Sequence, residues 1–209
     1  MTATLKPNTM PTLERREPVV DLDGQVYLLE RFYGEQDAQA LFDTLLHEMA
    51  WQSEEIVVLG KHVLVPRLVC WHGEAGAVYR YSGVEHEPRP WTPTLRTIRG
   101  HVTKTCGVAF NTVLGNLYRD GADSMGWHAD NEPELGPEPV IASLSLGATR
   151  LFKLRHNRSK QTMDIRLTSG SLLLMCGPLQ SYWRHAVPKT KQAVGPRINL
   201  TFRRIVARS

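Results

Sequence analysis

The sequence of 209 residues has little cysteine and no long apolar run. Its three cysteines, Cys70, Cys106 and Cys176, are widely spaced and form no C-x-x-C pair. This argues against a disulfide framework and a structural zinc site, and it fits a reducing compartment. The first twenty residues lack the apolar run of a signal peptide, and no segment approaches the roughly 18 uninterrupted apolar residues of a membrane span. We therefore expect a soluble intracellular protein, cytoplasmic in a bacterium or nuclear in a eukaryote.

Neither sign of charge is strongly in excess. The formal net charge is +4, with 42% hydrophobic and 22% charged residues, which is ordinary for a globular protein and permits a polyanionic partner without requiring one. A chain of this length suits one domain. We expect residues 1–22 to form a flexible arm and residues 23–209 to form that single domain.

The early part of the chain favours helix, and the rest favours strands. After an expected strand over residues 25–32, the apolar spacing in residues 35–51 predicts an amphipathic helix. A second helix is expected over residues 92–107, with Thr94 as its candidate cap. Residues 55–67 favour a hairpin that turns at Gly60 and Lys61. Further strands are expected over residues 78–83, 110–118, 141–147, 149–156, 164–177 and 197–206. This order predicts an α+β fold with a β-sandwich or barrel core.

In the stretch GWHADNE, His128 and Asp130 are two positions apart. Two histidines and one carboxylate bind iron(II) on one side and leave the opposite positions open. Only His156 and His185 follow Asp130 in the chain. His156 lies in the basic turn KLRHNRSK, which suits phosphate or solvent, whereas His185 follows the apolar run SLLLMCG, whose end would support a ligand. From these residues alone, His185 is equally well interpreted as a third ligand or as an ordinary loop histidine.

Polar and apolar residues alternate without a break over Arg197–Arg203. In a strand, the four polar side chains would share one face. The two arginines at its ends would then lie about 20 Å apart, too far to hold one carboxylate but suited to opposite ends of a small dianion or its surroundings. Asn116 and Tyr118 likewise share a strand face just before His128. Taken alone, Arg197–Arg203 would also fit a half-exposed edge strand.

The order of these features resembles the AlkB family of iron(II)- and 2-oxoglutarate-dependent dioxygenases. The resemblance rests on N-L-Y (Asn116–Tyr118), H-x-D (His128–Asp130), His185 and R-x-N-L-T-F-R (Arg197–Arg203). The stretches VVLGKHVLVPR, YRYSG, PWTP and IASLSLGATRLFKLRH are similar to the branch that repairs duplex DNA. The resemblance extends over about residues 50–206.

The resemblance implies a double-stranded β-helix, or jelly roll, with N-terminal helices and a nucleotide-recognition hairpin lid within residues 50–90. It implies that iron(II) is held by His128, Asp130 and His185, which are also the catalytic residues, and that O2 is consumed. It further implies that 2-oxoglutarate is bound by Asn116, Tyr118, Arg197, Thr201 and Arg203. In this arrangement Arg203 lies near the metal-chelating carboxylate, and Arg197 with Tyr118 holds the distal one.

The implied activity is oxidative demethylation of 1-methyladenine and 3-methylcytosine in DNA, in which hydroxylation of the N-methyl group releases formaldehyde. A base in a duplex must first be flipped out of the stack. Tyr79, Arg80 and Tyr81 would line the base pocket, with Tyr81 stacked on one face of the base and His128 on the other. Val58, Leu59, Gly60 and Lys61 would form a tip that fills the vacated stack. The duplex-repair branch has an aromatic residue where this chain has Leu59, and an acid where it has Asn131, which is followed here by Glu132.

Basic residues outside this site are candidates for phosphate contacts, although charged hairpins are usually only solvated. They are Lys153, Arg155, His156, Arg158, Lys160, Lys189, Lys191 and, at the base of the hairpin, Arg67. The expected partner is alkylated DNA, with RNA as an alternative, and the protein is expected to be monomeric and not bound to a membrane. Two other interpretations stay open: a 2-oxoglutarate oxygenase that acts on RNA, protein or a small molecule, and a non-catalytic nucleic-acid-binding jelly roll.

Overall fold

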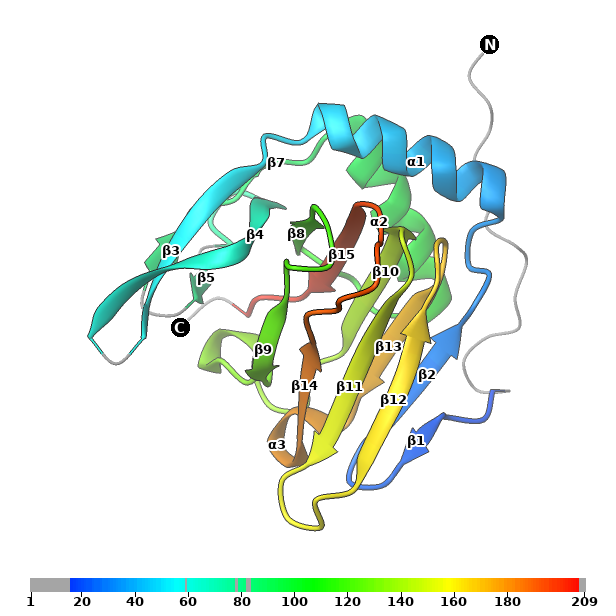
Figure 1. Ribbon diagram of the computed structural model, residues 1–209, viewed down its shortest axis with the longest axis vertical. Coiled ribbons are helices and arrows are strands. Elements are labelled where there is room, and N and C mark those ends of the chain that lie inside the picture. The colour runs from blue at the N-terminus through cyan, green and yellow to red at the C-terminus, as the bar shows by residue number, and fades with distance from the viewer. Residues whose placement is uncertain (1–15, 59, 78, 82–83, 207–209) are drawn as a thin grey trace.

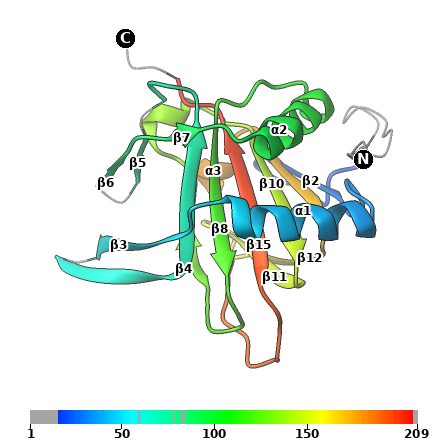
Figure 2. The ribbon, with the colours of Figure 1, turned by 90° about the horizontal axis from the view of Figure 1, so that it is seen from above.

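The computed structural model describes residues 16–58, 60–77, 79–81 and 84–206, and for residues 56–58, 61, 79–81 and 84–86 it describes the backbone alone. Within these residues, a large and a small β-sheet face each other, and two helices cover the outer side of the large sheet (Figures 1 and 2). This arrangement confirms the expected α+β fold with a jelly-roll core. No described helix has both the length and the apolar character needed to cross a membrane.

The large sheet has the strand order β1-β2-β13-β10-β15-β8-β4-β3, with β7 added beside β4. Its strands are β1 (Val20–Asp21), β2 (Gln25–Leu29), β3 (Gln52–Val58), β4 (Lys61–Gly73), β7 (Arg89–Pro90), β8 (Thr112–Tyr118), β10 (Ile141–Gly147), β13 (Leu172–Cys176) and β15 (Arg197–Arg203). Strands β10, β15 and β8 lie in the middle of this order. Their side chains are therefore buried on both faces of the sheet, as the fully buried patterns of β8 and β15 show.

The small sheet has the order β12-β11-β14-β9. Its strands are β9 (Met125–His128), β11 (Arg150–His156), β12 (Thr162–Leu167) and β14 (Trp183–Val187). A separate hairpin pairs β5 (Tyr79–Tyr81) with β6 (Val84–His86). The helical segments are α1 (Glu35–Glu48), α2 (Pro93–Cys106), α3 (Leu179–Tyr182) and the 3-10 turn η2 (Pro133–Leu135).

The apolar residues form two cores, one on each side of the large sheet. The first joins the buried faces of α1 and α2 to the sheet, through residues such as Leu45, Ile98 and Leu200. The second lies between the two sheets, where Leu114 of β8 belongs to the same cluster as Leu154 of β11. The candidate site lies on this second side of the sheet, between two rigid layers.

The N-cap of the second helix lies two residues earlier than predicted. The Thr92 hydroxyl accepts a hydrogen bond from the Leu95 amide at 3.1 Å, so Thr92 and not Thr94 is the N-cap. Pro93 then occupies the first helical position, where its missing N–H costs nothing. Gly107 ends the helix in the left-handed conformation (φ 69°), as is common for glycine.

Two further expectations differ from the structure. The single strand expected over residues 164–177 is two strands, β12 and β13, which lie in different sheets and are separated by a turn with Gly170 at φ +78°. The expected arm of residues 1–22 is too long, because Val20–Asp21 pairs with β2 and the Trp183 indole donates to the Leu22 carbonyl. Residues 1–15 of that arm lie outside the described residues.

Candidate active site

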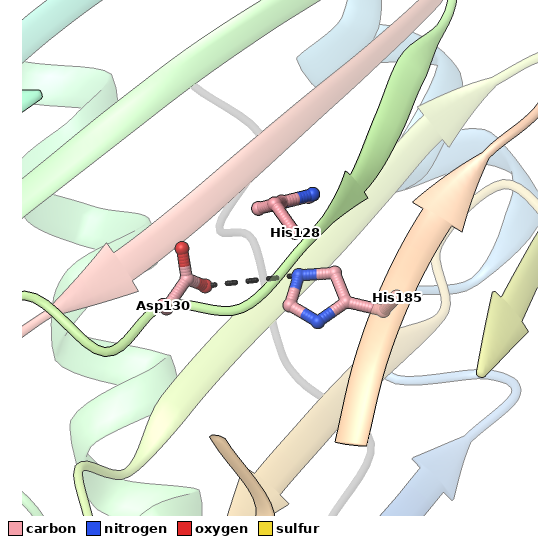
Figure 3. Close-up of side chains that lie close together, drawn as sticks. All are labelled: His128, Asp130 and His185. Atoms are coloured by element: carbon pink, nitrogen blue, oxygen red, sulfur yellow. Dashed lines mark ion pairs between the residues drawn. The ribbon is translucent and has the colours of Figure 1, made fainter. Parts of the chain in front are cut away.

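His128, Asp130 and His185 converge between the two sheets (Figure 3). His128 ends β9 and is the Cα partner of His185 on the neighbouring strand β14, so both imidazoles extend from one face of the small sheet. One potential ligand atom from each of the three side chains lies within 4.8 Å of the other two. The prediction that His185 follows directly on the apolar run SLLLMCG was wrong in detail, because α3 intervenes and His185 has a strand of its own.

Each of the three residues is held by a neighbour. His128 Nδ1 lies 2.9 Å from the Gly126 carbonyl, which can only accept, so this nitrogen carries the proton and leaves Nε2 as the donor for a metal. The Asp130 amide donates to Gln180 Oε1 of α3 at 2.9 Å. The His185 ring stacks on Phe152 with a centroid distance of 5.2 Å. Such contacts hold ligands in place before a metal binds.

The protonation states also suit a metal. Burial lowers the pKa of His128, and burial together with the neighbouring His128 lowers the pKa of His185 to about 3. Burial alone would raise the pKa of Asp130, but Arg203 and the two histidines outweigh it and lower this pKa to about 2. At neutral pH the cluster therefore offers two neutral imidazoles and one carboxylate, the forms that coordinate a divalent cation. This ligand set is typical of non-haem iron(II).

Strand β15 shows the alternation expected from the sequence. Its apolar residues belong to the core beneath the helices, and its polar residues line the same pocket as the histidine–aspartate cluster. β15 is paired with β8 so that Arg197 faces Tyr118 and Asn199 faces Asn116. Two adjacent strands therefore present one continuous polar surface. The pocket is lined by Asn116, Tyr118, His128, Asp130, Ser143, His185, Arg197, Asn199, Thr201 and Arg203, with apolar residues between them.

Arg197 is a cation that the surrounding protein does not fully satisfy. It is 1% exposed, and its Nη2 donates to Ser145 Oγ at 2.9 Å. Its Nε and Nη1 are buried without a hydrogen-bond partner among the described residues. Burial lowers its pKa to about 10 against the opposing effect of Tyr118, so it stays charged at neutral pH. A buried guanidinium with free donors suits a carboxylate, so this half of the pocket fits one end of a dicarboxylate.

Arg203, at the other end of β15, lies against the metal-binding cluster. Its Nη2 donates to Asp130 Oδ1 at 2.7 Å, and both side chains are buried. The two arginines of one strand therefore differ in position: Arg203 is beside the candidate metal ligands, and Arg197 is beside Tyr118, with its Cζ atom 5.2 Å from the ring centroid.

Asn199 was not among the predicted binding residues, although it lines the pocket. Its Nδ2 donates to Ser143 Oγ at 2.7 Å and to the Leu144 carbonyl at 3.1 Å. Its Oδ1 accepts from the Thr201 hydroxyl at 3.1 Å. Asn199 thereby fixes the position of Thr201. Its place among the alternating polar residues of Arg197–Arg203 could have predicted that it lines the pocket.

Arg67 lies elsewhere than expected. The sequence placed it among the substrate contacts, but it is 2% exposed and its Nε donates to Asn116 Oδ1 at 2.7 Å. Its position in the middle of β4, which pairs with β8, accounts for this burial. Because Arg67 occupies the amide oxygen of Asn116, the amide nitrogen of Asn116 is the group left to face a ligand.

Arg150 is a second buried residue near the site that was not predicted from the sequence. It is 3% exposed and lies at the start of β11. Its guanidinium donates to the carbonyls of Asp120 at 3.0 Å, Asp123 at 2.8 Å and Pro188 at 2.7 Å, and it lies 5.6 Å from the Tyr118 ring centroid. It therefore joins the loop that precedes β9 to the residue that follows β14. Arg150 lies two positions before the buried Phe152 on the same strand, and this spacing could have predicted that its side chain also faces inward.

Only some of the residues predicted to contact a base are described with their side chains. Asn131 is exposed and Glu132 half-buried, just after Asp130. Gly60 lies at an exposed turn (φ +76°) between β3 and β4. Leu59 is outside the described residues, and for Val58, Lys61 and Tyr79–Tyr81 only the backbone is described. Their contacts with a base stay predictions.

The basic segment is not uniform. Arg155, Arg158 and Lys160 are exposed, as are Lys189 and Lys191. Lys153 pairs with Asp164 at 2.7 Å. His156 differs from its prediction as a phosphate contact, because it is buried, with Nε2 3.0 Å from Asp23 Oδ2 and Nδ1 accepting from the Ser159 amide.

Comparison with known proteins agrees with this geometry. Residues 25–203 match the family described as the 2OG-Fe(II) oxygenase superfamily. Human DNA oxidative demethylase ALKBH2 is 40% identical over 185 residues, which cover 83% of this chain and 71% of that protein. The chain belongs to the AlkB family of 2OG-Fe(II) oxygenases. Like the rest of this superfamily it is a dioxygenase that uses iron(II), 2-oxoglutarate and O2, and its described residues fit both the metal and the dicarboxylate.

Two further AlkB homologues are similar to this chain. Human alpha-ketoglutarate-dependent dioxygenase alkB homolog 3 is 38% identical over 192 residues, covering 87% of this chain and 66% of that protein. The solved structure of OsALKBH1 aligns with a TM-score of 0.62 at 18% identity, over 86% of this chain and 97% of that one. The second likeness concerns the fold alone.

Proposed function

We propose that this dioxygenase oxidatively demethylates N-alkylated bases of the 1-methyladenine and 3-methylcytosine type in DNA and releases formaldehyde. The observation that carries the proposal is that His128, Asp130 and His185 share one pocket with the polar residues of β15. The similarity to human DNA oxidative demethylase ALKBH2 favours DNA as the substrate. The net charge of +4 is compatible with a nucleic acid. We further propose that the protein acts as a monomer.

His128, Asp130 and His185 would hold the iron. When bound there, iron(II) supplies the oxidising chemistry with O2 and 2-oxoglutarate. The task of the chain is to hold the ligands and to exclude water. Gln180 and the Gly126 carbonyl hold two of the ligands, and Phe152 packs on the third.

Arg197, Arg203, Asn116, Tyr118 and Thr201 would hold 2-oxoglutarate. Arg197 and Tyr118 suit the distal carboxylate because two nitrogens of this guanidinium are buried without a hydrogen-bond partner among the described residues. Arg203 suits the end next to the metal because it is hydrogen-bonded to Asp130. This orientation uses the separation of the two arginines along β15, since each is assigned a different end of one short molecule.

The alkylated base would enter at the side where β5 and the tip between β3 and β4 lie. We propose that Tyr79, Arg80 and Tyr81 receive a base flipped out of the stack, with Asn131 and Glu132 beside it. Val58, Leu59, Gly60 and Lys61 would occupy the space left in a duplex. Arg67 is better assigned to holding Asn116 than to a substrate contact.

The test is formaldehyde release from 1-methyladenine in matched single- and double-stranded oligonucleotides, with iron(II), ascorbate and 2-oxoglutarate. Asp130→Ala is the control, checked for folding by thermal melting. We expect release by the wild type and none by the variant, and the ratio between the two substrates measures duplex preference. Binding of 2-oxoglutarate without release would contradict the alkylated-base substrate and leave an oxygenase of RNA, protein or a small molecule.

A further inference from the structure

The turn that joins β1 to β2 consists of Leu22, Asp23 and Gly24 and lies against segments far along the chain. The Leu22 carbonyl accepts a hydrogen bond from the Trp183 indole at 2.8 Å. The Asp23 carboxylate lies 3.0 Å from Nε2 of the buried His156. Trp183 is the first residue of β14 and directly follows α3. This β1–β2 turn (residues 22–24) therefore ties the edge of the large sheet to the small sheet.

Gly24 packs directly against α3. A Cβ atom on Gly24 would lie 2.6 Å from both the backbone nitrogen and the Cα of Leu179, the first residue of α3. Gly24 has φ 121° and Asp23 has φ 49°, so two consecutive residues adopt backbone conformations that most side chains disfavour. Such a turn persists where the surrounding contacts determine it. The β1–β2 turn and α3 thus fit each other closely.

The next residue of α3, Gln180, connects this contact to the metal-binding cluster. Its side chain is buried, with Oε1 accepting from the Asp130 amide at 2.9 Å and Nε2 donating to Met175 Sδ at 3.5 Å. A thioether sulfur is a weak acceptor, so the bond to Asp130 is the stronger of the two. Asp130 lies between the end of β9 and η2, outside the described strands, so sheet pairing does not fix its backbone. Gln180 supplies that fixed point.

The two oxygens of the Asp130 carboxylate have different neighbours. Oδ1 accepts from Arg203 at 2.7 Å, and Oδ2 lies 3.9 Å from His185 Nε2, where it is placed to bind a metal (Figure 3). The Arg203 contact by itself would let the carboxylate turn about Oδ1 and follow the guanidinium. A fixed backbone removes this freedom. The direction of Oδ2 therefore depends on Gln180 as well as on Arg203.

We propose that the β1–β2 turn is a positioning element of the metal site, which fixes α3 and, through Gln180, the direction of the Asp130 carboxylate. None of the three turn residues lines the pocket. The effect of the turn is carried by a continuous series of packed and hydrogen-bonded groups, from Gly24 through Leu179 and Gln180 to Asp130. The inference rests on the proposed function in one respect, the assignment of Asp130 as a metal ligand.

The test is manganese(II) binding by the full chain, measured by isothermal titration, in three variants that interrupt this series. Gln180→Met keeps the size of the side chain and removes the acceptor of the Asp130 amide. We expect it to weaken manganese binding about 10- to 100-fold, as is typical when a group that orients a metal ligand is lost. Gly24→Ala displaces α3, and Trp183→Phe removes the indole donor to the turn. Each should weaken binding less, by about three- to tenfold, because Gln180 can still reach Asp130.

Two matched controls separate positioning from a general loss of stability. Gly107→Ala also places a side chain at positive φ (69°), but its Cβ would find no neighbour within 4 Å among the described residues. Ser171→Ala removes a buried hydroxyl that donates to the Thr168 carbonyl at 2.7 Å. Both should bind manganese within about twofold of the wild type, because they are independent of the series. Titrations are made well below the melting temperature of each variant, so lower stability alone does not lower the affinity.

The visible spectrum of bound cobalt(II) gives a second readout, because it depends on the number and arrangement of the ligands. At saturating cobalt(II) we expect Gln180→Met to change this spectrum and both controls to leave it unchanged. A variant that only loosens the fold would lower the melting temperature and leave the spectrum as in the wild type. Wild-type manganese affinity and cobalt spectrum in Gln180→Met would overturn the inference. Wild-type affinity in both Gly24→Ala and Trp183→Phe would overturn the role of the turn.

Asp130→Ala separates this inference from the proposed function. If Asp130→Ala binds manganese like the wild type, the assignment of this ligand fails. If its binding is lost while Gln180→Met and Gly24→Ala bind normally, the ligand assignment stands and the role of the turn fails. If methylated DNA yields no formaldehyde while these two variants weaken manganese binding, the proposed substrate fails and the role of the turn stands.

Discussion

The two sheets contribute opposite halves of the active site. The small sheet supplies His128 and His185, and the loop after β9 supplies Asp130, so this half presents neutral nitrogens and a carboxylate that suit a cation. The large sheet supplies Arg197 and its partners, a half that suits an anion. Neither half is electrostatically complete by itself. The pocket is therefore shaped for two ligands of opposite charge that bind side by side.

The largest effect is expected when a metal ligand is removed from the cation-binding half. We expect His185→Ala to reduce binding of manganese(II), a redox-inert substitute for iron, to the detection limit, because two ligands then remain of three. Isothermal titration measures this. Binding of 2-oxoglutarate in the absence of metal should persist. Undiminished manganese affinity would contradict the assignment of His185.

The anion half is tested by Arg197→Met. Loss of a charge-assisted hydrogen bond is worth roughly 1.5–3 kcal/mol, so we expect the KM for 2-oxoglutarate to rise about 10- to 150-fold, with a smaller effect on kcat. Manganese binding should be unchanged. A further sign is expected in the ligand-free protein, whose melting temperature should not fall, because a buried charge with unsatisfied donors is replaced by an apolar side chain.

Arg150→Met tests the contacts that lie at the border between the two halves. Removal of three buried hydrogen bonds to carbonyls should lower the free energy of unfolding by about 2–4 kcal/mol, measured by urea denaturation. If Arg150 also positions Tyr118, its effect on 2-oxoglutarate affinity should not add to that of Tyr118→Leu in a double-mutant cycle. Full additivity would restrict Arg150 to a structural role.

The smallest expected effect is a pH dependence of the metal-free protein. The pKa of His185 is about 3 in the fold against an ordinary value of 6.5, so the unfolded chain binds more protons between these values. Stability should therefore be complete above pH 6.5 and fall as the pH drops, by roughly 1–2 kcal/mol at pH 5. Below pH 3.8 Asp130 adds to the loss, since its pKa is also lowered. Urea midpoints at pH 7 and 5 measure this, and His185→Asn should reduce the difference.

The sequence was most informative where function and periodicity coincide. The alternation in Arg197–Arg203 predicted β15 and its polar face, because a strand separates its two faces whatever its neighbours. The pairing of His128 with His185 was not predictable, because nothing local encodes which strands become adjacent. The burial of Arg67 escaped prediction for the same reason, since it depends on the position of β4 beside β8.

The residue types near the start of α2 led to a wrong prediction of its N-cap. Thr94 and Thr92 are equally suitable caps by residue type, and the position of Pro93 decides between them. The boundary of the N-terminal arm was misplaced because β1 is short and is held by pairing with β2 rather than by its own composition.

The hydrogen bonds of Asp130 have a consequence for the order of events during synthesis. Its amide bonds to a residue 50 positions later, and its carboxylate bonds to one 73 positions later, on β15. Asp130 is therefore held by both contacts only after the segments that carry Gln180 and Arg203 have been synthesised and have packed against it. We expect a chain that lacks β15 to hold the Asp130 carboxylate less firmly and to bind a divalent metal more weakly, because the Arg203 contact is then missing.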